Sequence, residues 1–185
     1  MSTRDSRSDA VLIDLCNTGD RDAAVDAFEA LYQRHKQYVL RVAYRYTQDS
    51  DLALDVLQET FSYILRKLPP SGEGLDLGSK LQTLLYVAAK NSAISLLRKT
   101  RRTDSAVDPD ELPTPAYRDT SELAQLLRGL PAGQRELMTL RFVDDCSLRD
   151  IAGILDIPLG TVKSRLHQAI QGMRKSRYVK EFFNK

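Results

Sequence analysis

The sequence predicts an all-α fold, with two helical domains joined by a flexible acidic linker. Three observations support this. Apolar residues recur at helical spacing over most of the 185 residues. Nine glycines and seven prolines, without dense alternation of polar and apolar residues, disfavour an all-β fold. Residues 103–118 have no apolar period and contain three prolines, so we expect one domain on each side of them.

The first two helices are bounded by clear signals. The first is predicted at 9–17 and ends before Gly19, and Asp20 can cap a long second helix. The pattern breaks at 48–50, where a third helix begins. The residues expected in the core of the second and third helices are Phe28, Leu31, Tyr32, Val39, Val42, Tyr46, Leu52, Val56, Leu57, Phe61, Ile64 and Leu65.

Prolines separate the third helix from the fourth. Pro69 and Pro70 end the third helix, because proline lacks an N–H donor and clashes with the preceding turn. Residues 71–79 contain three glycines and are predicted to form a flexible loop. A fourth helix is expected at roughly 80–99. Its predicted apolar face consists of Leu81, Leu84, Leu85, Val87, Ala88, Ile94 and Leu97.

Composition excludes several classes of protein. Hydrophobic residues make up 42% of the chain and charged residues 28%, which is typical of a globular protein. No stretch approaches the roughly 20 apolar residues needed to cross a bilayer, and the N-terminus lacks the apolar core of a signal peptide. We therefore expect a cytoplasmic protein that does not insert into a membrane.

The residues that usually carry chemistry are scattered. Cys16 and Cys146 are far apart and indicate neither a disulfide framework nor a zinc site, so we interpret them as small buried hydrophobes. The two histidines, His35 and His167, are isolated, and His35 is expected at the edge of a helix core. No paired carboxylates have metal-binding spacing. We expect no catalytic residue, no metal and no cofactor.

The net charge of +2 hides a local imbalance. Residues 80–102 and 158–180 each contain six basic residues and no acid, whereas residues 103–123 contain six acids and one base. This pattern indicates two nucleic-acid-binding modules on a tether. The alternative is that both basic windows are ordinary solvated helix faces.

A helix-turn-helix is the most specific local signal. Ser147 and Asp150 have the spacing of a capping box, Asp156 stands at a turn that tolerates left-handed backbone, and Pro158 suits a helix start. Val162 faces inward with Leu166. The residues left for the outer face are Thr161, Lys163, Ser164, His167 and Gln168. The alternative is a plain helical hairpin in a bundle.

The outer face has the chemistry of base recognition. In a helix-turn-helix the second helix enters the major groove and its N-terminal residues contact base edges. Lys163 can donate to guanine O6 and N7, and Gln168 can pair with adenine. Thr161 and Ser164 suit bases or phosphates.

At this point a family resemblance is clear. Residues 147–175, SLRDIAGILDIPLGTVKSRLHQAIQGMRK, resemble region 4 of extracytoplasmic-function (ECF) sigma factors, and residues 127–145 resemble the helices that precede that motif. Residues 27–68 resemble regions 2.1 and 2.2, and residues 84–99, LLYVAAKNSAISLLRK, resemble regions 2.3 and 2.4. The GTVKSRL segment alone is shared with other regulators, whereas the paired matches are far more specific.

The resemblance implies a sigma factor: a subunit without a catalytic centre that binds core RNA polymerase, directs promoter-specific initiation at the minus-10 and minus-35 elements, and aids DNA melting. Region 2 would cover residues 1–102, the linker 103–119 and region 4 residues 120–185. The implied partners are the β′ clamp helices and β flap of the polymerase, promoter DNA and an anti-sigma factor.

The resemblance also implies site residues. Polymerase binding would fall to Asp55, Gln58, Glu59 and Phe61, on an acidic face with an aromatic beside it. Minus-10 binding would fall to Lys80, Lys90, Asn91, Arg98, Lys99 and Arg101, with Asn91 meeting an unstacked base. Minus-35 binding would fall to Thr161, Lys163, Ser164, Arg165, His167 and Gln168. Two residues depart from the family pattern: Leu84 stands for the usual tryptophan and Ser95 for a frequent aspartate.

Two other functions remain open on the sequence alone. A stand-alone helix-turn-helix regulator would dimerise through its N-terminal domain, and a nuclease would carry the C-terminal domain as a DNA-binding tail. The acidic face and the region 2 resemblance disfavour the regulator, and the isolated histidines disfavour the nuclease. The linker either imitates a nucleic-acid backbone in the polymerase cleft or is a plain tether. The inducing signal and the regulon are not indicated.

Overall fold

The computed structural model describes residues 5–77, 80–103, 127 and 129–175. The chain divides into two compact units, Met1–Pro113 and Thr114–Lys185. All regular secondary structure in the described residues is helical, which confirms the all-α prediction. The predicted linker, apart from Thr103 at the end of its N-terminal neighbour helix, lies outside the described residues.

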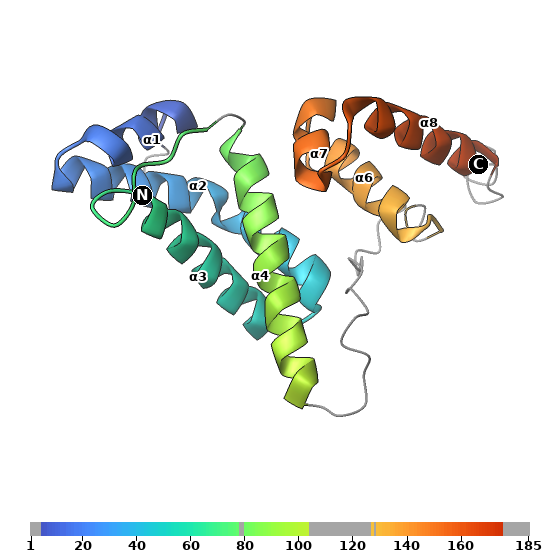
Figure 1. Ribbon diagram of the computed structural model, residues 1–185, viewed down its shortest axis with the longest axis horizontal. Helices are drawn as coiled ribbons and strands as arrows, with labels where there is room; N and C mark the ends of the chain where they lie inside the picture. The colour runs from blue at the N-terminus through green and yellow to red at the C-terminus, as the bar shows by residue number, and fades with distance from the viewer. Residues whose placement is uncertain (1–4, 78–79, 104–126, 128, 176–185) are drawn as a thin grey trace. The chain divides into compact units, whose positions relative to one another are not determined.

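Four helices form the first unit: α1 (Asp9–Thr18), α2 (Arg21–Thr47), α3 (Ser50–Lys67) and α4 (Leu81–Thr103). The long α2 packs against each of the other three, and α4 also packs along α3 (Figure 1). No helix of the described part of the chain is long and apolar enough to span a membrane.

The helix ends follow the predicted capping chemistry. The side chain of Asp20 accepts the N–H of Ala23 at 2.9 Å and caps α2, as expected. Gln48 ends α2 with a left-handed φ of 54°, and α3 begins at once behind Asp49. The φ of Gly19 is one that any residue can adopt, so glycine is not needed there for its conformation. It is needed for space, because a Cβ would lie 2.5 Å from the carbonyl oxygen of Leu15.

The core of this unit lies between α2, α3 and α4. Its predicted members are mostly buried, and the hydroxyls of Tyr46 and Tyr86 meet inside it at 3.1 Å. Two predictions need correction. Leu65 was expected in the core but is 53% exposed. On α4 the most buried residues are Leu81, Leu85, Tyr86, Ala89 and Ala93, whereas Leu84, Val87, Ala88, Ile94 and Leu97 are only half-buried or line its edges.

The α4 correction has a physical reason. Residues four apart share one face of a helix, and the stripe Leu81, Leu85, Ala89, Ala93 contains small residues where α4 approaches α2 and α3. Small side chains allow close approach and therefore complete burial. The apolar face predicted from the sequence also included residues that lie on the flanks of this stripe.

The described part of the predicted flexible loop, residues 71–77, is held by α1. Leu75 is 7% exposed, and the side-chain amide of Asn17 hydrogen-bonds to both its N–H and its carbonyl. These contacts fasten this part of the loop to the first unit's helices. Residues 78–79 lie outside the described residues.

Three helices of the second unit are described: α6 (Ala132–Phe142), α7 (Leu148–Leu155) and α8 (Leu159–Lys175). Each packs against the other two. Their core includes Leu127, Leu130, Met138 and Ala169, with Leu166, Ile170 and Met173 packed against it.

The turn between α7 and α8 has the predicted geometry. Ser147 and Asp150 form a reciprocal capping box, with bonds of 2.9 and 3.1 Å. Asp156 ends α7 in the left-handed conformation, with φ of 49°. α7 and α8 therefore form the expected helix-turn-helix.

Candidate nucleic-acid and protein interfaces

The outer face of α8 is polar along its first three turns. Val162 and Ala169 are fully buried, which turns the opposite side of the helix to solvent. The structure brings all six predicted residues together on α8: Lys163, Ser164, Arg165, His167 and Gln168 are exposed, and Thr161 is half-buried.

The start of α8 is suited to an anionic partner. Its first turn contains no acid, and the N-terminus of a helix favours negative charge. The carbonyl of Pro158 accepts the N–H groups of Thr161 and Val162. The Ser164 hydroxyl donates to the carbonyl of Thr161 at 3.1 Å, so its oxygen remains able to accept a further hydrogen bond.

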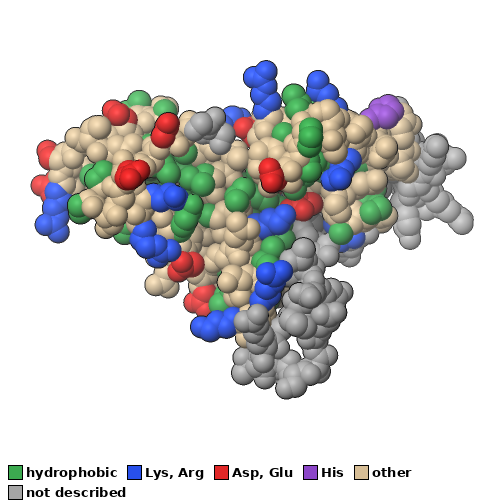
Figure 2. Space-filling model, viewed as in Figure 1, with side chains coloured by type: hydrophobic (Ala, Val, Ile, Leu, Met, Phe, Trp, Pro, Cys, Tyr) green, Lys and Arg blue, Asp and Glu red, His purple; other side chains and the backbone are tan. Residues whose placement is uncertain are grey.

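The second basic surface lies on α4. Asn91, Arg98 and Lys99 are exposed on this helix, Lys80 is exposed just before it, and Lys90 is half-buried. Arg101 belongs to α4, but its side chain lies outside the described residues. Figure 2 shows Lys and Arg side chains among acidic ones over the region where α4 runs in Figure 1.

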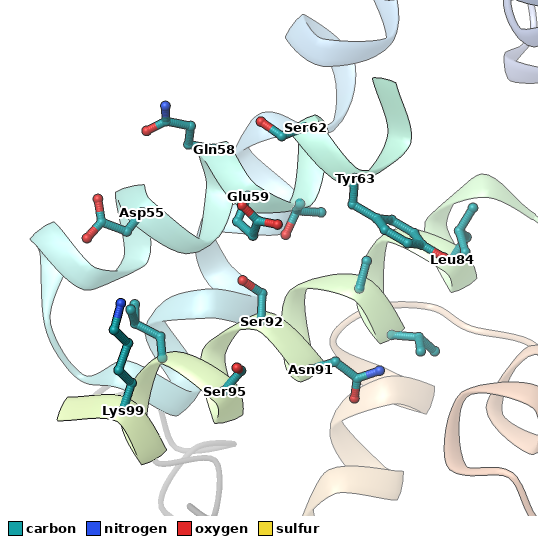
Figure 3. A pocket seen from close by; sticks show the side chains of 14 residues that line it. Asp55, Gln58, Glu59, Ser62, Tyr63, Leu84, Asn91, Ser92, Ser95 and Lys99 are labelled. Carbon is teal, nitrogen blue, oxygen red and sulfur yellow. The ribbon is translucent and has the colours of Figure 1, made fainter. Parts of the chain in front are cut away.

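An open groove of about 720 Å³ runs between α3 and α4. Its α3 wall includes Asp55 and Glu59, and its α4 wall includes Leu84 and Ser95, the two residues that depart from the family pattern. Figure 3 shows Asn91 at the rim, pointing away from α3, whereas the neighbouring Ser92 points toward α3.

The acids at the start of α3 have different roles. Asp49 caps the helix, accepting the N–H groups of Asp51 and Leu52, so it serves the fold. Glu59 pairs with Arg66 at 2.8 Å. Asp55 and Gln58 are exposed on the same helix, as expected.

Phe61 was expected both in the core of the third helix and beside the acids of the polymerase-binding face, and the structure buries it. It is only 6% exposed. Its ring packs edge-on against Tyr32 and Phe28, with centroids 4.9 and 6.2 Å away. Aromatic pairs prefer this geometry, so its α2 neighbours hold the ring inward.

Phe61 nevertheless helps to line a second groove of about 540 Å³, between α2 and α3. Leu54 and Leu65 flank this groove and are 52% and 53% exposed. Neither leucine was predicted from the sequence as a surface feature. The signal was available, because residues 54, 58 and 65 lie on one side of a helix with 3.6 residues per turn.

Some other titratable residues make contacts within the fold. His35 is half-buried and its Nε2 lies 2.8 Å from the Asp9 carboxylate, which joins α2 to α1. Arg7 lowers the pKa of Asp5 to about 2 through hydrogen bonds to its carboxylate. Among the described residues, no group of three or more His, Cys, Asp or Glu could hold a metal ion.

Family comparisons agree with both halves of this geometry. Residues 31–103 match the model described as Sigma-70 region 2, and residues 120–172 match that of Sigma-70, region 4. The first match contains α3 and α4, and the second contains the helix-turn-helix. The two matches define a promoter-recognition subunit of RNA polymerase.

Individual relatives narrow the class. The chain is 27% identical over 177 residues to the ECF RNA polymerase sigma factor SigW of Bacillus subtilis, covering 85% of this chain and 90% of that protein. It is 31% identical over 146 residues to the sigma factor SigV of the same organism, covering 76% and 84%. A solved structure of the sigma factor RpoE with the anti-sigma factor NepR from Bartonella quintana matches with a TM-score of 0.57 at 25% identity, covering 80% of this chain and 94% of that one.

The chain therefore belongs to the ECF sigma factors of the sigma-70 family. It directs RNA polymerase to promoters, through region 2 at the minus-10 element and region 4 at the minus-35 element. Sigma factors are non-catalytic subunits of the polymerase, so this assignment replaces the stand-alone regulator and the nuclease as alternatives.

Proposed function

We propose that this sigma factor docks on the β′ clamp helices through α3 and reads the minus-10 element through α4. Asp55 and Gln58 are exposed on α3, and Leu54 beside them offers apolar surface. Interfaces commonly combine an apolar centre with a polar rim. Glu59 belongs to this polar rim. Phe61 contributes as the buried floor of the groove between α2 and α3.

Asn91 captures an unstacked base of the minus-10 element. An amide can donate and accept on a base edge, and capture offsets the cost of unstacking, which is a few kcal/mol. Lys90, Arg98 and Lys99 on the same helix, together with Lys80 before it, supply phosphate contacts. Arg101 is assigned to this set by its position on α4.

Region 4 reads the minus-35 element through α8, and the β flap holds region 4 on the polymerase. Lys163 and Gln168 provide base contacts, Thr161 and Ser164 serve bases or phosphates, and Arg165 and His167 complete the face. In this proposal region 2 covers residues 1–102 and region 4 residues 120–185. The acidic segment 103–119 connects them, as a backbone mimic or as a plain tether.

An anti-sigma factor regulates the chain. The RpoE structure that this chain resembles contains an anti-sigma factor. The groove between α2 and α3, flanked by Leu54 and Leu65, is a surface to which either such an inhibitor or the polymerase could bind. Competition between a candidate inhibitor and core polymerase for the purified chain would test this. Simultaneous binding of both would contradict it.

One observation carries the proposal most strongly: Asn91 is exposed on the basic helix α4 and points away from α3 (Figure 3). Asn91→Ala should reduce open-complex formation on a duplex promoter and alter base preference at one minus-10 position. On a template already mismatched there, the general defect should shrink, because part of the unstacking cost is absent. Permanganate footprinting and run-off transcription on both templates measure these effects.

Ser92→Ala is the matched control, because Ser92 is the next residue and points toward α3. It should leave base preference unchanged. Equal open-complex formation by Asn91→Ala and wild type, with the same preference at every minus-10 position, would remove Asn91 from base capture.

A further inference from the structure

The side chain of Asn17 makes two hydrogen bonds to the backbone of Leu75. Its Nδ2 donates to the Leu75 carbonyl at 3.0 Å, and its Oδ1 accepts the Leu75 N–H at 2.9 Å. Asn17 lies near the end of α1, and Leu75 lies in the loop between α3 and α4. We call this pair of bonds the Asn17–Leu75 clasp.

The loop also makes backbone hydrogen bonds to the C-terminal end of α3. The N–H of Gly74 donates to the carbonyl of Lys67 at 3.0 Å, and the N–H of Gly72 donates to that of Leu68 at 2.9 Å. Gly74 has φ of +101°, and a Cβ there would lie 3.1 Å from Oδ1 of Asn17. Glycine is therefore needed at this position for both conformation and space.

Few side chains can replace Asn17. The clasp needs one donor and one acceptor side by side on a planar group, which a carboxamide supplies. Aspartate would still accept the N–H of Leu75 but would place a carboxylate oxygen against its carbonyl. Alanine would leave both groups of Leu75 without this partner, although the Leu75 side chain itself is buried.

The held segment ends shortly before α4 begins at Leu81. We propose that Asn17 is a positioning residue for promoter opening: it fixes residues 71–77 so that the approach to α4 is already formed when the minus-10 base arrives. The inference rests on the proposed base capture by α4. Preorganisation raises affinity because less ordering entropy is lost on binding.

The experiment compares Asn17→Ala with Thr18→Ala in the full chain bound to core polymerase. Thr18 is the matched control, because its hydroxyl donates to the Asp14 carbonyl within α1. Loss of two neutral hydrogen bonds should lower open-complex yield on duplex promoter by about tenfold for Asn17→Ala. The affinity for core polymerase should stay unchanged for both variants.

Two further readouts separate positioning from general destabilisation. Hydrogen exchange of the Leu75 amide should become faster in Asn17→Ala and not in Thr18→Ala. Gly74→Ala strains the clasp from the loop side and should reproduce the opening defect. Asn17→Ala and Asn91→Ala combined should lower the yield by less than the product of the single effects, because both act on one capture step.

The outcomes distinguish this inference from the proposed function. Wild-type opening by Asn17→Ala, while Asn91→Ala is defective, would overturn the positioning role alone. A double variant whose loss of yield equals the product of the two single losses would also overturn the positioning role. A defect in Asn17→Ala with none in Asn91→Ala would overturn base capture by Asn91 and leave the loop role standing.

Discussion

Glu59 and Arg66 form an ion pair along the surface of α3, with 2.8 Å between Oε1 and Nη2 and both side chains 59% exposed. Exposed pairs of this kind contribute about 0–1 kcal/mol. The pair therefore matters less for stability than for the charge that α3 presents. It partly neutralises Glu59, whereas Asp55 keeps its charge exposed one turn earlier.

Asp55→Lys should weaken binding to core polymerase more than Glu59→Lys does, because Arg66 already offsets the charge of Glu59. Fluorescence anisotropy of the labelled chain, titrated with core enzyme, measures both. Asp14→Lys, at an exposed position of α1, is the control with the same charge change. If Asp14→Lys weakens binding as much as Asp55→Lys does, the effect is one of net charge.

The exposed leucines of α3 give a second test. Leu54→Ser should weaken polymerase binding severalfold with only a small loss of stability, since half of this side chain is already in water. Val25→Ser on α2, where the side chain is 60% exposed, is the matched control. Equal affinities for the two variants would remove the α2–α3 groove from the polymerase interface.

Lys163→Ala should reduce recognition of the minus-35 element by about 1–3 kcal/mol if Lys163 contacts a guanine. Holoenzyme binding to promoters with each base substituted in turn measures this. Arg149→Ala removes the same charge from α7, and base preference should not change. Should Lys163→Ala weaken every sequence equally and change only the salt dependence, the residue contacts phosphate.

Ser147→Ala should destabilise region 4 by about 1 kcal/mol, because it leaves the N–H of Asp150 without its cap. Thermal unfolding followed by circular dichroism measures this loss. Ser164→Ala is the comparison, since its hydroxyl bonds to a carbonyl in an exposed part of α8. Equal melting temperatures for wild type and Ser147→Ala would show that the capping box is dispensable.

Both cysteines should resist alkylation in the native protein. Cys16 and Cys146 are each 4% exposed, and burial raises the pKa of the Cys16 thiol. A raised pKa keeps the thiol protonated at neutral pH, and the thiolate is the reactive form. Mass spectrometry after iodoacetamide treatment, with and without denaturant, checks this. Rapid native labelling at Cys16 would contradict the burial of its thiol.

Local chemistry explains what the sequence could predict. Asp20, Ser147 and Asp156 act within a few residues of their own positions, so their roles can be recognised without tertiary information. The same holds for the face of α8, where two buried residues orient the rest of the helix.

Tertiary packing explains what the sequence could not predict. The exposure of Leu65 depends on where α2 and α4 leave α3 uncovered. Nothing in the sequence near Asn17 indicates that it binds the loop. Its partner is 58 residues away in the chain, so only the folded structure brings the two together.

That separation has a consequence for folding order. Closing a long chain loop costs entropy before the two ends stabilise each other, whereas α1, α2 and α3 follow one another directly and can pack through near neighbours. During synthesis Asn17 leaves the ribosome long before Leu75 does. We expect the clasp to form late in folding and to break early when region 2 opens locally.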